Sequence, residues 1–339
     1  MQVYWQNGSV TSSVGSKPVV AGLGFFDGVH LGHQAILLRV LELANEMGGL
    51  PLMVTFDRHP LAMISPDSVP LLLNHATERR SYVWELGIEA IAELVFDKQF
   101  SELPPEEFVT RILAQQLGVV AVVAGEDFHF GYRGEGGIKL LKQLGPAWGI
   151  RITDVVEPVL VKGVRVSSTR IRALLKAGNV KEAARCLGRP YRLRGPVVVG
   201  EGRGRHLGFP TANLDIPKER LVPKDGVYAV TVEVVDDFFD TQGVSIADTA
   251  EMMGVLSIGD KPTFHGTERA IEVHVLHRQE SYYGKELEIS FHEWLRPSER
   301  FADAQELQSQ VQRDIETTRR LFKTMPWAGG GKIYSHRAL

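Results

Sequence analysis

Two histidines three positions apart, His30 and His33, stand where an apolar run ends and a helical pattern begins. The run Val19–Leu23 leads through a glycine-containing turn into this pair. Side chains three apart in the first turn of a helix lie on the same side, and helix N-termini bind phosphate through N–H groups and a partial positive charge. Both imidazoles could therefore bond phosphate oxygens and the charge that develops during a transfer reaction. The spacing predicts a phosphate-transfer site with His30 and His33 as catalytic residues.

The turn before these histidines differs from two common phosphate motifs. Gly22-Leu23-Gly24 begins a dinucleotide-binding fingerprint, but Asp27 stands where the third glycine should be. A G-x-x-x-x-G-K-[ST] segment is missing from the sequence. Either histidine alone would more often be a surface or capping residue, so the prediction rests on the pair and its glycine-bracketed turn.

A second candidate site is the segment Gly200–Leu214, which has four glycines in its first nine residues. Such a backbone can approach a ligand closely and turn its N–H groups toward it. Thr211 and Asn213 are neutral oxygen donors two residues apart, and in a strand this spacing places both on one face. They could then reach one Mg²⁺ ion or its waters, because magnesium takes its remaining ligands from nucleotide phosphates. A flexible loop with solvated arginines is the alternative interpretation.

The elements that must position these residues differ between the two halves of the chain. In the first half, apolar strands alternate with helical patterns, which is typical of a parallel sheet with crossover helices. From Tyr191 the strands follow one another without helices, which favours an antiparallel barrel or sandwich. The predicted elements of the first half are strands Val19–Leu23, Leu52–Phe56 and Val119–Gly125 and helices Gly32–Ala44, Glu106–Gln116 and Ile138–Leu144. Those of the second half are strands Gly195–Val199, Val227–Val235, Met253–Ile258, Ile271–Leu276 and Leu287–Phe291 and a last helix, Asp303–Phe322.

Length and composition bound the remaining possibilities. The 339 residues suggest two domains, and Gly188 followed by Pro190 predicts a boundary, giving domains 1–188 and 189–325 and a loose tail, 326–339. A net charge of -3, from 38 basic and 41 acidic residues, argues against a nucleic-acid or membrane partner. The single cysteine, Cys186, fits a reducing cytoplasm, and no signal peptide or membrane span is evident. The oligomeric state stays open.

Four segments of the first half together resemble the FAD synthetase branch of the nucleotidyltransferase superfamily, found in bacterial bifunctional enzymes. The resemblance covers its H-x-G-H motif at His30–His33 and its S-S-T-R-I-R motif at Ser167–Arg172. The segments Thr55–Pro60 and Gly125–Gly131 are similar to its T-F-E-P-H-P and G-x-D-F-x-F-G motifs. The resemblance implies an ATP site formed by Gly24, Phe26, Asp27, His30, His33, Ser168, Thr169 and Arg172, and a flavin side formed by His59 and Asp127.

The second half resembles riboflavin kinases. Gly200–Leu214 matches the signature G-x-G-R-G-x-x-L-G-F-P-T-A-N-L, and Ile271–His274 matches the I-E-x-H strand. The resemblance implies that Glu272 is the general base for the ribityl hydroxyl, and that Arg296 lies on the flavin side. Without it, a lone strand carboxylate such as Glu272 would be expected to face water. The implied ATP-binding residues are Gly200, Gly202, Arg203, Gly204, Gly208, Pro210 and Thr211, with Thr211 and Asn213 at Mg²⁺.

Together the resemblances imply a Rossmann-like α/β nucleotidyltransferase domain followed by a six-stranded Greek-key barrel with a C-terminal helix. The expected function is phosphorylation of riboflavin to FMN by ATP, then adenylylation of FMN to FAD, with riboflavin, FMN and ATP as small-molecule partners and Mg²⁺ as the cofactor. Phe25 and Arg58, which depart from the family pattern, leave open a kinase whose first domain has another task. A flavin-binding regulatory or carrier protein is the second alternative. A nucleic-acid-binding module is the third, although the basic residues are scattered.

Overall fold

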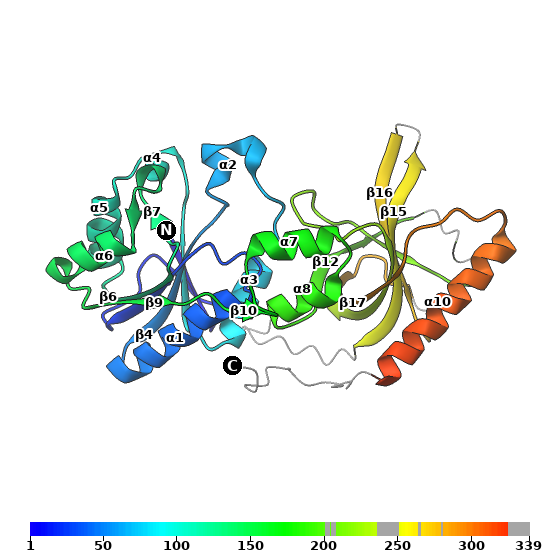
Figure 1. Ribbon diagram of the computed structural model, residues 1–339, viewed down its shortest axis with the longest axis horizontal. Helices are drawn as coiled ribbons and strands as arrows, with labels where there is room; N and C mark the ends of the chain where they lie inside the picture. The colour runs from blue at the N-terminus through cyan, green and yellow to red at the C-terminus, as the bar shows by residue number, and fades with distance from the viewer. Residues whose placement is uncertain (201–203, 205–207, 236–250, 264–265, 279–280, 325–339) are drawn as a thin grey trace. The chain divides into compact units, whose positions relative to one another are not determined.

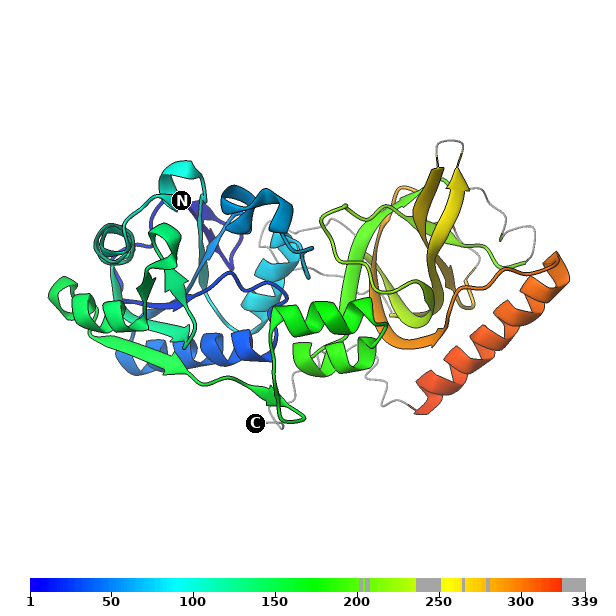
Figure 2. The same ribbon diagram turned by 45° about the horizontal axis from the view of Figure 1, so that its top comes forward.

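The structure is a computed structural model that describes residues 1–200, 204, 208–235, 251–263, 266–278 and 281–324. Its contacts divide the described chain into two compact units, Met1–Ser168 and the residues from Thr169 on. Each unit is shown in Figures 1 and 2 and has its own sheet and core. The predicted loose tail, 326–339, lies outside the described residues.

The first unit is built on a seven-stranded sheet of order β2-β1-β5-β4-β3-β6-β9. The five strands β5, β4, β3, β6 and β9 run parallel, and β1 pairs antiparallel with β5. Its strands are β1 (Gln2–Trp5), β2 (Val10–Thr11), β3 (Val19–Leu23), β4 (Leu50–Phe56), β5 (Ala90–Leu94), β6 (Val119–Gly125) and β9 (Ile152–Val156), with short hairpin strands β7 (His129–Phe130), β8 (Gly136–Gly137), β10 (Leu160–Val161) and β11 (Val164–Arg165).

Two helical layers cover this sheet, because its fully buried strands must be shielded on both faces. On one face, α1 and α3 pack against Val20, Met53 and Val123; on the other, η2 and α6 pack against Ala21 and neighbouring strand residues. The helical segments are α1 (Leu31–Met47), α2 (Leu61–Ile64), η1 (Pro66–Ser68), α3 (Ala76–Glu85), α4 (Lys98–Ser101), α5 (Pro105–Glu107), the π-helical η2 (Phe108–Gln116), η3 (Tyr132–Gly134), α6 (Ile138–Leu144) and η4 (Gly145–Trp148). The expected Rossmann-like α/β fold is confirmed.

The second unit contains a closed six-stranded antiparallel barrel of order β12-β13-β16-β15-β14-β17. Three consecutive strands, β14 to β16, form a meander, and β13 crosses over to pair with β16, which is a Greek-key connection. The expected barrel is therefore confirmed. Its strands are β12 (Tyr191–Val198), β13 (Ala212–Leu214), β14 (Gly226–Val235), β15 (Met252–Thr263), β16 (Gly266–Val275) and β17 (Glu286–Arg296).

Within the described residues, the helices α7 (Ser168–Lys176), α8 (Val180–Leu187) and α10 (Ala304–Thr324) accompany the barrel. The helices α7 and α8 are separated by Gly178, whose φ of 83° breaks the helix. The expected C-terminal helix is α10, which packs against β15 with Ile315 buried. By their contacts α7 and α8 group with the barrel, so the compact units part at Ser168, ahead of the boundary predicted at residue 188.

Two candidate active sites

The strand order of the first unit places its candidate residues along one edge of the sheet. The parallel strands run β5-β4-β3-β6-β9, so the order reverses between β3 and β6. In open α/β sheets ligands bind at this switch point, beyond the carboxyl ends of the strands. The loop Gly24–His30 follows β3, Asp57–Pro60 follows β4 and Glu126–Phe128 follows β6. Three of the four predicted motifs thus start at the same edge.

The two histidines form one stacked pair at the start of α1. His30 is the N-cap, and its Nδ1 accepts a hydrogen bond from the His33 N–H at 3.3 Å. The two rings lie 3.6 Å apart with an interplanar angle of 15°, and Phe26 packs edge-on against His33. A Cβ at Gly32 would lie 3.2 Å from the His30 ring, so glycine lets the rings lie close to the backbone. The predicted pairing on one side of the first turn is therefore present.

The loop before α1 is held in a conformation that most residues avoid. Phe26 and Val29 have φ angles of 57° and 40°, values that are strained for bulky and β-branched residues. Buried Asp27 holds the loop: its carboxylate accepts the Leu73 N–H at 2.9 Å, and its carbonyl accepts the Ser168 hydroxyl at 2.9 Å. Such strain persists only where surrounding contacts determine the loop, as they do here.

Asn74 is a loop anchor that the sequence patterns did not reveal. Its side-chain oxygen accepts the Gly28 N–H at 2.5 Å, and the residue is 5% exposed. It lies in no recognised motif and stands two residues before the first residue of α3. Only the fold brings it against the loop.

Phe25 and Arg58, the two residues that depart from the family pattern, are both held by neighbouring side chains. The Phe25 ring packs edge-on against His59 at 4.8 Å. Asp57 accepts the Phe96 N–H at 2.9 Å and pairs with Arg58 at 2.9 Å. Burial raises the pKa of Asp57, but these hydrogen bonds outweigh it and hold that pKa below its usual value. The loop that proline would stiffen in the family is thus fixed here through an aspartate.

The remaining residues of the first predicted site are spread over two units. Asp127 is exposed after β6 and pairs with Arg165 at 2.8 Å. Ser168, Thr169 and Arg172 all lie in α7, but Ser168 belongs to the first unit and donates its hydroxyl to the Asp27 carbonyl, whereas Thr169 and Arg172 belong to the second unit. A nucleotide-binding role for these three α7 residues stays a prediction.

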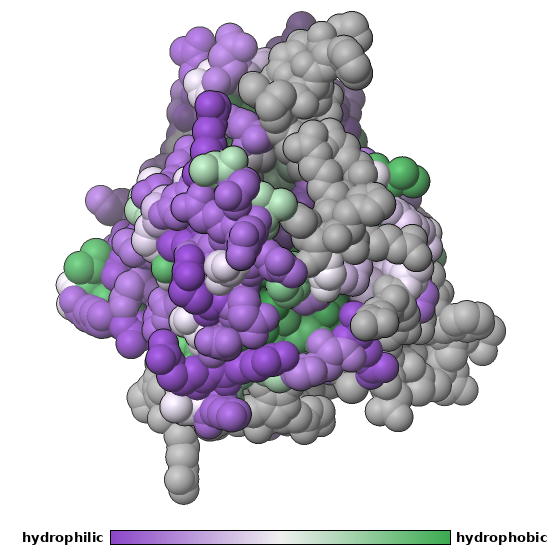
Figure 3. Space-filling view, turned by 90° about the vertical axis from the view of Figure 1, so that its right-hand side faces the viewer, coloured by the Kyte–Doolittle hydropathy of each residue, from purple (hydrophilic) through white to green (hydrophobic). Residues whose placement is uncertain are grey.

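The second candidate site is a cavity of about 360 Å³ in the barrel unit. Its polar lining includes Thr211, Asn213, Ser257, Glu272, His274 and Arg296, and its apolar lining includes Val227, Val255, Phe209, Phe301, Leu307 and Val311. Figure 3 views the barrel unit from the side on which Figure 1 draws α10, and hydrophobic side chains are visible there between hydrophilic ones. The volume lies within the range of ligand pockets, which combine an apolar wall with a few polar groups.

Strand register brings the polar residues of this cavity together. Asn213 on β13 and Ser257 on β15 both stand directly opposite Glu272 on β16. The Thr211 hydroxyl lies 3.5 Å from the Glu272 carboxylate. Opposite positions on neighbouring strands share one face, so three oxygen-bearing side chains converge on Glu272. This carboxylate lines the cavity rather than the outer surface of the barrel.

Gly200 and Gly204 lie so close to Asn213 and Phe209 that a side chain at either position would collide with them. A Cβ at Gly200 would lie 2.1 Å from the Asn213 amide, and one at Gly204 would lie 2.4 Å from the Phe209 carbonyl. Gly208 has a φ of 83°, and the Pro210 carbonyl accepts a hydrogen bond from His274 Nδ1 at 2.9 Å. The predicted residues Gly202 and Arg203 lie outside the described residues.

His274 is a cavity residue to which the sequence assigned no role. It lies two positions after Glu272 on the same strand, so both face the cavity. Burial lowers the pKa of His274 from its ordinary value, although its bond to Pro210 acts in the opposite direction. The neutral ring with its proton on Nδ1 therefore buttresses the segment that carries Thr211.

Arg296 lines the cavity but is also tied to the last helix. Its guanidinium makes a bidentate pair with Asp314 of α10, with N–O distances of 2.8 to 3.1 Å, and it lies 5.7 Å from the Phe301 ring centre. Asp314 is 4% exposed and also accepts a hydrogen bond from Gln310 at 2.9 Å. The predicted flavin-side arginine thus fixes α10 as one wall of the cavity.

In the part of the chain that the structure describes, no group of three or more His, Cys, Asp or Glu side chains is arranged to hold a metal ion. None of the described helices is both long enough and apolar enough to span a bilayer.

Comparison with known proteins assigns each unit to a family. Residues 13–170 match the family model for FAD synthetase, and residues 187–322 match that for riboflavin kinase. A bifunctional riboflavin kinase/FMN adenylyltransferase of Pseudomonas fluorescens is 37% identical over 89% of this chain and 92% of its own. The enzyme of that name from Bacillus subtilis is 32% identical over 91% and 94%.

A solved structure agrees over both units. A crystal structure from Streptococcus pneumoniae, described as a macrolide-efflux protein, matches with a TM-score of 0.79 and 31% identity over 91% of this chain and 95% of that one. These matches span nearly the whole described chain. They agree with the paired histidines of the first unit and with the Glu272 cavity of the second. The chain belongs to the family of bifunctional riboflavin kinases/FMN adenylyltransferases, and it contains both catalytic domains of that family.

Proposed function

We propose that the barrel cavity phosphorylates riboflavin and that the switch-point site of the first unit adenylylates the resulting FMN. The convergence of Thr211, Asn213 and Glu272 in one cavity is the observation that carries this assignment. Phosphoryl transfer requires positioning and charge neutralisation, plus one carboxylate directed at the attacking hydroxyl. The cavity offers the Glu272 carboxylate beside the neutral oxygen donors Thr211 and Asn213.

In the kinase step, Glu272 accepts the proton of the terminal ribityl hydroxyl while that oxygen attacks the γ-phosphorus of ATP. ADP leaves, and FMN is formed. The neutral side chains of Thr211 and Asn213 suit Mg²⁺, which prefers oxygen ligands and takes others from phosphates and water. Such an ion would neutralise charge on the transferred phosphate. The described residues fit it, because both donors line the same wall as Glu272.

In the adenylylation step, a phosphate oxygen of FMN attacks the α-phosphorus of ATP, and pyrophosphate leaves. His30 and His33 bind the phosphates at the α1 N-terminus, where the helix dipole adds to their effect. Ser168, Thr169 and Arg172 contribute further phosphate contacts, and His59 and Asp127 lie toward the flavin. The step needs no covalent intermediate, since orientation and electrostatic stabilisation can supply the acceleration.

The experiment that tests this function follows flavins by chromatography. The chain is incubated with ATP and Mg²⁺ and either riboflavin or FMN, alongside His33→Ala and the exposed-turn control His277→Asn. We expect FMN and then FAD from riboflavin, and we expect His33→Ala to stop FAD formation while FMN still accumulates. FMN without FAD from the unsubstituted chain would refute the function of the first unit and favour a kinase whose first domain has another task. Flavin binding without ATP consumption would refute both activities.

A further inference from the structure

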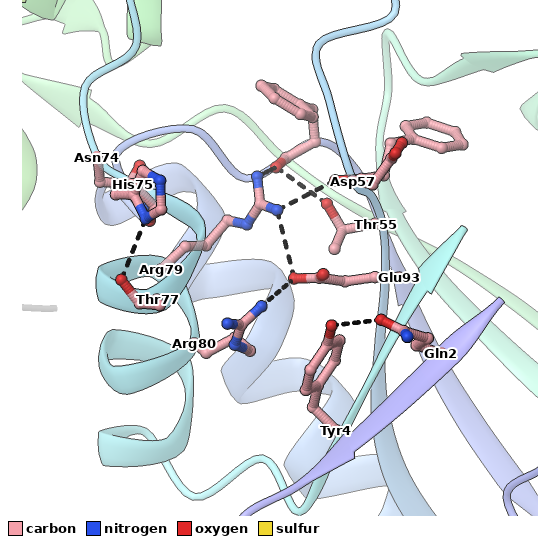
Figure 4. Close-up of polar contacts among 12 residues, drawn as sticks. Gln2, Tyr4, Thr55, Asp57, Asn74, His75, Thr77, Arg79, Arg80 and Glu93 are labelled. Atoms are coloured by element: carbon pink, nitrogen blue, oxygen red, sulfur yellow. Dashed lines mark hydrogen bonds and ion pairs between the residues drawn. The ribbon is translucent and has the colours of Figure 1, made fainter. Parts of the chain in front are cut away.

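A buried arginine outside every recognised motif spans the two loops of the adenylylation site. Arg79 lies on α3, is 4% exposed, and extends toward the carboxyl ends of β3 and β4 (Figure 4). Its Nη1 donates to the Phe25 carbonyl at 3.3 Å, and its Nη2 donates to the Phe56 carbonyl at 3.0 Å. One planar guanidinium thus joins the loop that leads to His30 with the loop that leads to His59.

The Phe25 carbonyl is the better anchored of the two. It also accepts the hydroxyl of Thr55, which is fully buried on β4, at 3.1 Å. The Arg79 guanidinium lies 5.1 Å from the Phe25 ring centre, and that ring packs against His59. Arg79 therefore contacts Phe25 through both its backbone and its ring, and reaches His59 through it.

A carboxylate within the sheet holds this arginine in place. Glu93, near the end of β5 and 7% exposed, lies 3.6 Å from Arg79 and 2.9 Å from Arg80 (Figure 4). Burial lowers the pKa of Arg79, while the negative charges of Glu93 and Asp27 oppose that effect. A buried cation needs such a partner, since an unpaired one would be strongly destabilising.

The chain just before Arg79 acts on the same loop. Leu73 donates its N–H to Asp27, and Asn74 accepts the Gly28 N–H. One short segment, 73–79, therefore anchors the residues next to the strained backbone at Phe26 and Val29. Small displacements of such a loop matter, because an error of about 1 Å can cost about 100-fold in rate.

We propose that Arg79, held by Glu93, is a positioning residue of the adenylylation site that fixes the His30–His33 loop and the His59 loop relative to each other. This assignment rests on the proposed function. In this assignment Arg79 acts through the Phe25 and Phe56 carbonyls.

The test compares Arg79→Met with Arg80→Met in the full chain. Both variants remove one ion pair to Glu93, but only the first removes the two carbonyl contacts. We expect Arg79→Met to lower kcat/KM for FAD formation from FMN about 100-fold, and Arg80→Met to stay within about threefold. Riboflavin phosphorylation by the same preparations, measured below the unfolding temperature, serves as the internal reference and should not change.

Two further variants keep the proposal testable if Arg79→Met folds poorly. Arg79→Lys keeps the charge but cannot bridge both carbonyls as a planar fork, so it should fold and regain only part of the rate. Thr55→Val removes the other donor to Phe25 and should lower kcat/KM by about tenfold.

Several outcomes would overturn the assignment. One is an Arg79→Met enzyme that forms FAD at an unchanged rate, and another is an equal loss in Arg79→Met and Arg80→Met. A loss that only follows the folded fraction, measured by near-ultraviolet circular dichroism, would show a structural role instead. An unsubstituted chain that forms no FAD would refute the proposed function itself, and the assignment with it.

Discussion

At the scale of single residues, Glu272 should be indispensable to the kinase step and irrelevant to the other. Glu272→Gln keeps the shape of the side chain but removes the proton acceptor. Since general-base catalysis contributes about 10² to 10⁴-fold, we expect FMN formation from riboflavin to fall by at least about 100-fold. FAD formation from added FMN should be unchanged. Initial rates of both reactions, measured by flavin chromatography, check this.

The control for this prediction is Glu286→Gln. Glu286 lies on β17 and pairs with Arg194 at 2.6 Å, outside the described lining of the cavity. It should keep kinase activity near that of the unsubstituted chain. Full kinase activity in Glu272→Gln would remove Glu272 from the mechanism and leave the cavity without its proposed base.

A half-buried histidine makes the barrel sensitive to acid. His292 on β17 contacts the Thr231 hydroxyl at 3.0 Å and packs edge-on against Phe322 of α10. The hydroxyl donates its own proton to Glu251, so it accepts one from His292 Nε2. Burial, followed by the charge of Arg192, lowers the pKa of His292 from 6.5 to about 4. The native state therefore favours the neutral ring.

The sign of the pH effect follows from this lowered pKa. Above pH 6.5, His292 is neutral in both the folded and the unfolded chain and does not change the stability. Between pH 6.5 and about pH 4, the unfolded chain binds a proton at His292 that the folded barrel does not bind. Stability should fall by about 3 kcal/mol across that window. Denaturant unfolding at several pH values measures it. His292→Gln should flatten the dependence, and an unaltered slope in that variant would contradict the prediction.

At the scale of elements, one ion pair joins α10 to the barrel. Asp314→Asn would leave the partly buried Arg296 with a weakened partner. Breaking a fully buried pair costs about 3 kcal/mol or more, so we expect a smaller loss of stability here. We expect a lower unfolding midpoint for the barrel and a raised KM for riboflavin, because α10 forms a wall of the cavity. Glu316→Gln, on the exposed side of α10, is the matched control. Equal effects of both substitutions would exclude the Arg296–Asp314 pair as the specific link.

The elements show where sequence patterns are sufficient and where they fail. The strand Val119–Gly125 was predicted with its observed ends, because an uninterrupted buried strand in a parallel sheet is continuously apolar. The strand β5 was missed, because Glu93 interrupts its apolar run. Glu93 can be buried because it forms ion pairs with Arg79 and Arg80 on α3, and sequence patterns around β5 do not reveal these partners.

The same distinction holds for the sites. Thr211, Asn213 and Glu272 could be predicted because their spacing and motif are local, and strand register then joins them. Asn74 and Arg79 carry no local signal, since their contacts are to backbone groups that only the fold brings near. Anchors of this kind are visible only in three dimensions.

At the scale of the whole molecule, the two activities should be separable. Each compact unit has its own buried core, and the residues proposed to carry out the two reactions lie apart, His30 and His33 in the first unit and Glu272 in the second. A substitution in one site should therefore leave the other working. The intermediate FMN must then pass from the cavity of one unit to the switch point of the other.

This separation predicts that two inactive variants complement each other when mixed. Glu272→Gln cannot supply FMN and His33→Ala cannot use it, so neither alone should convert riboflavin to FAD. If FMN is released into solution, equal amounts of the two variants with riboflavin, ATP and Mg²⁺ should form FAD after a lag. That lag should shorten as protein concentration rises, because the intermediate must diffuse between molecules.

A mixture that accumulates FMN but forms no FAD, although Glu272→Gln adenylylates added FMN, would be inconsistent with simple release and uptake. A mixture that forms FAD without a lag would point to transfer within an assembly of both chains.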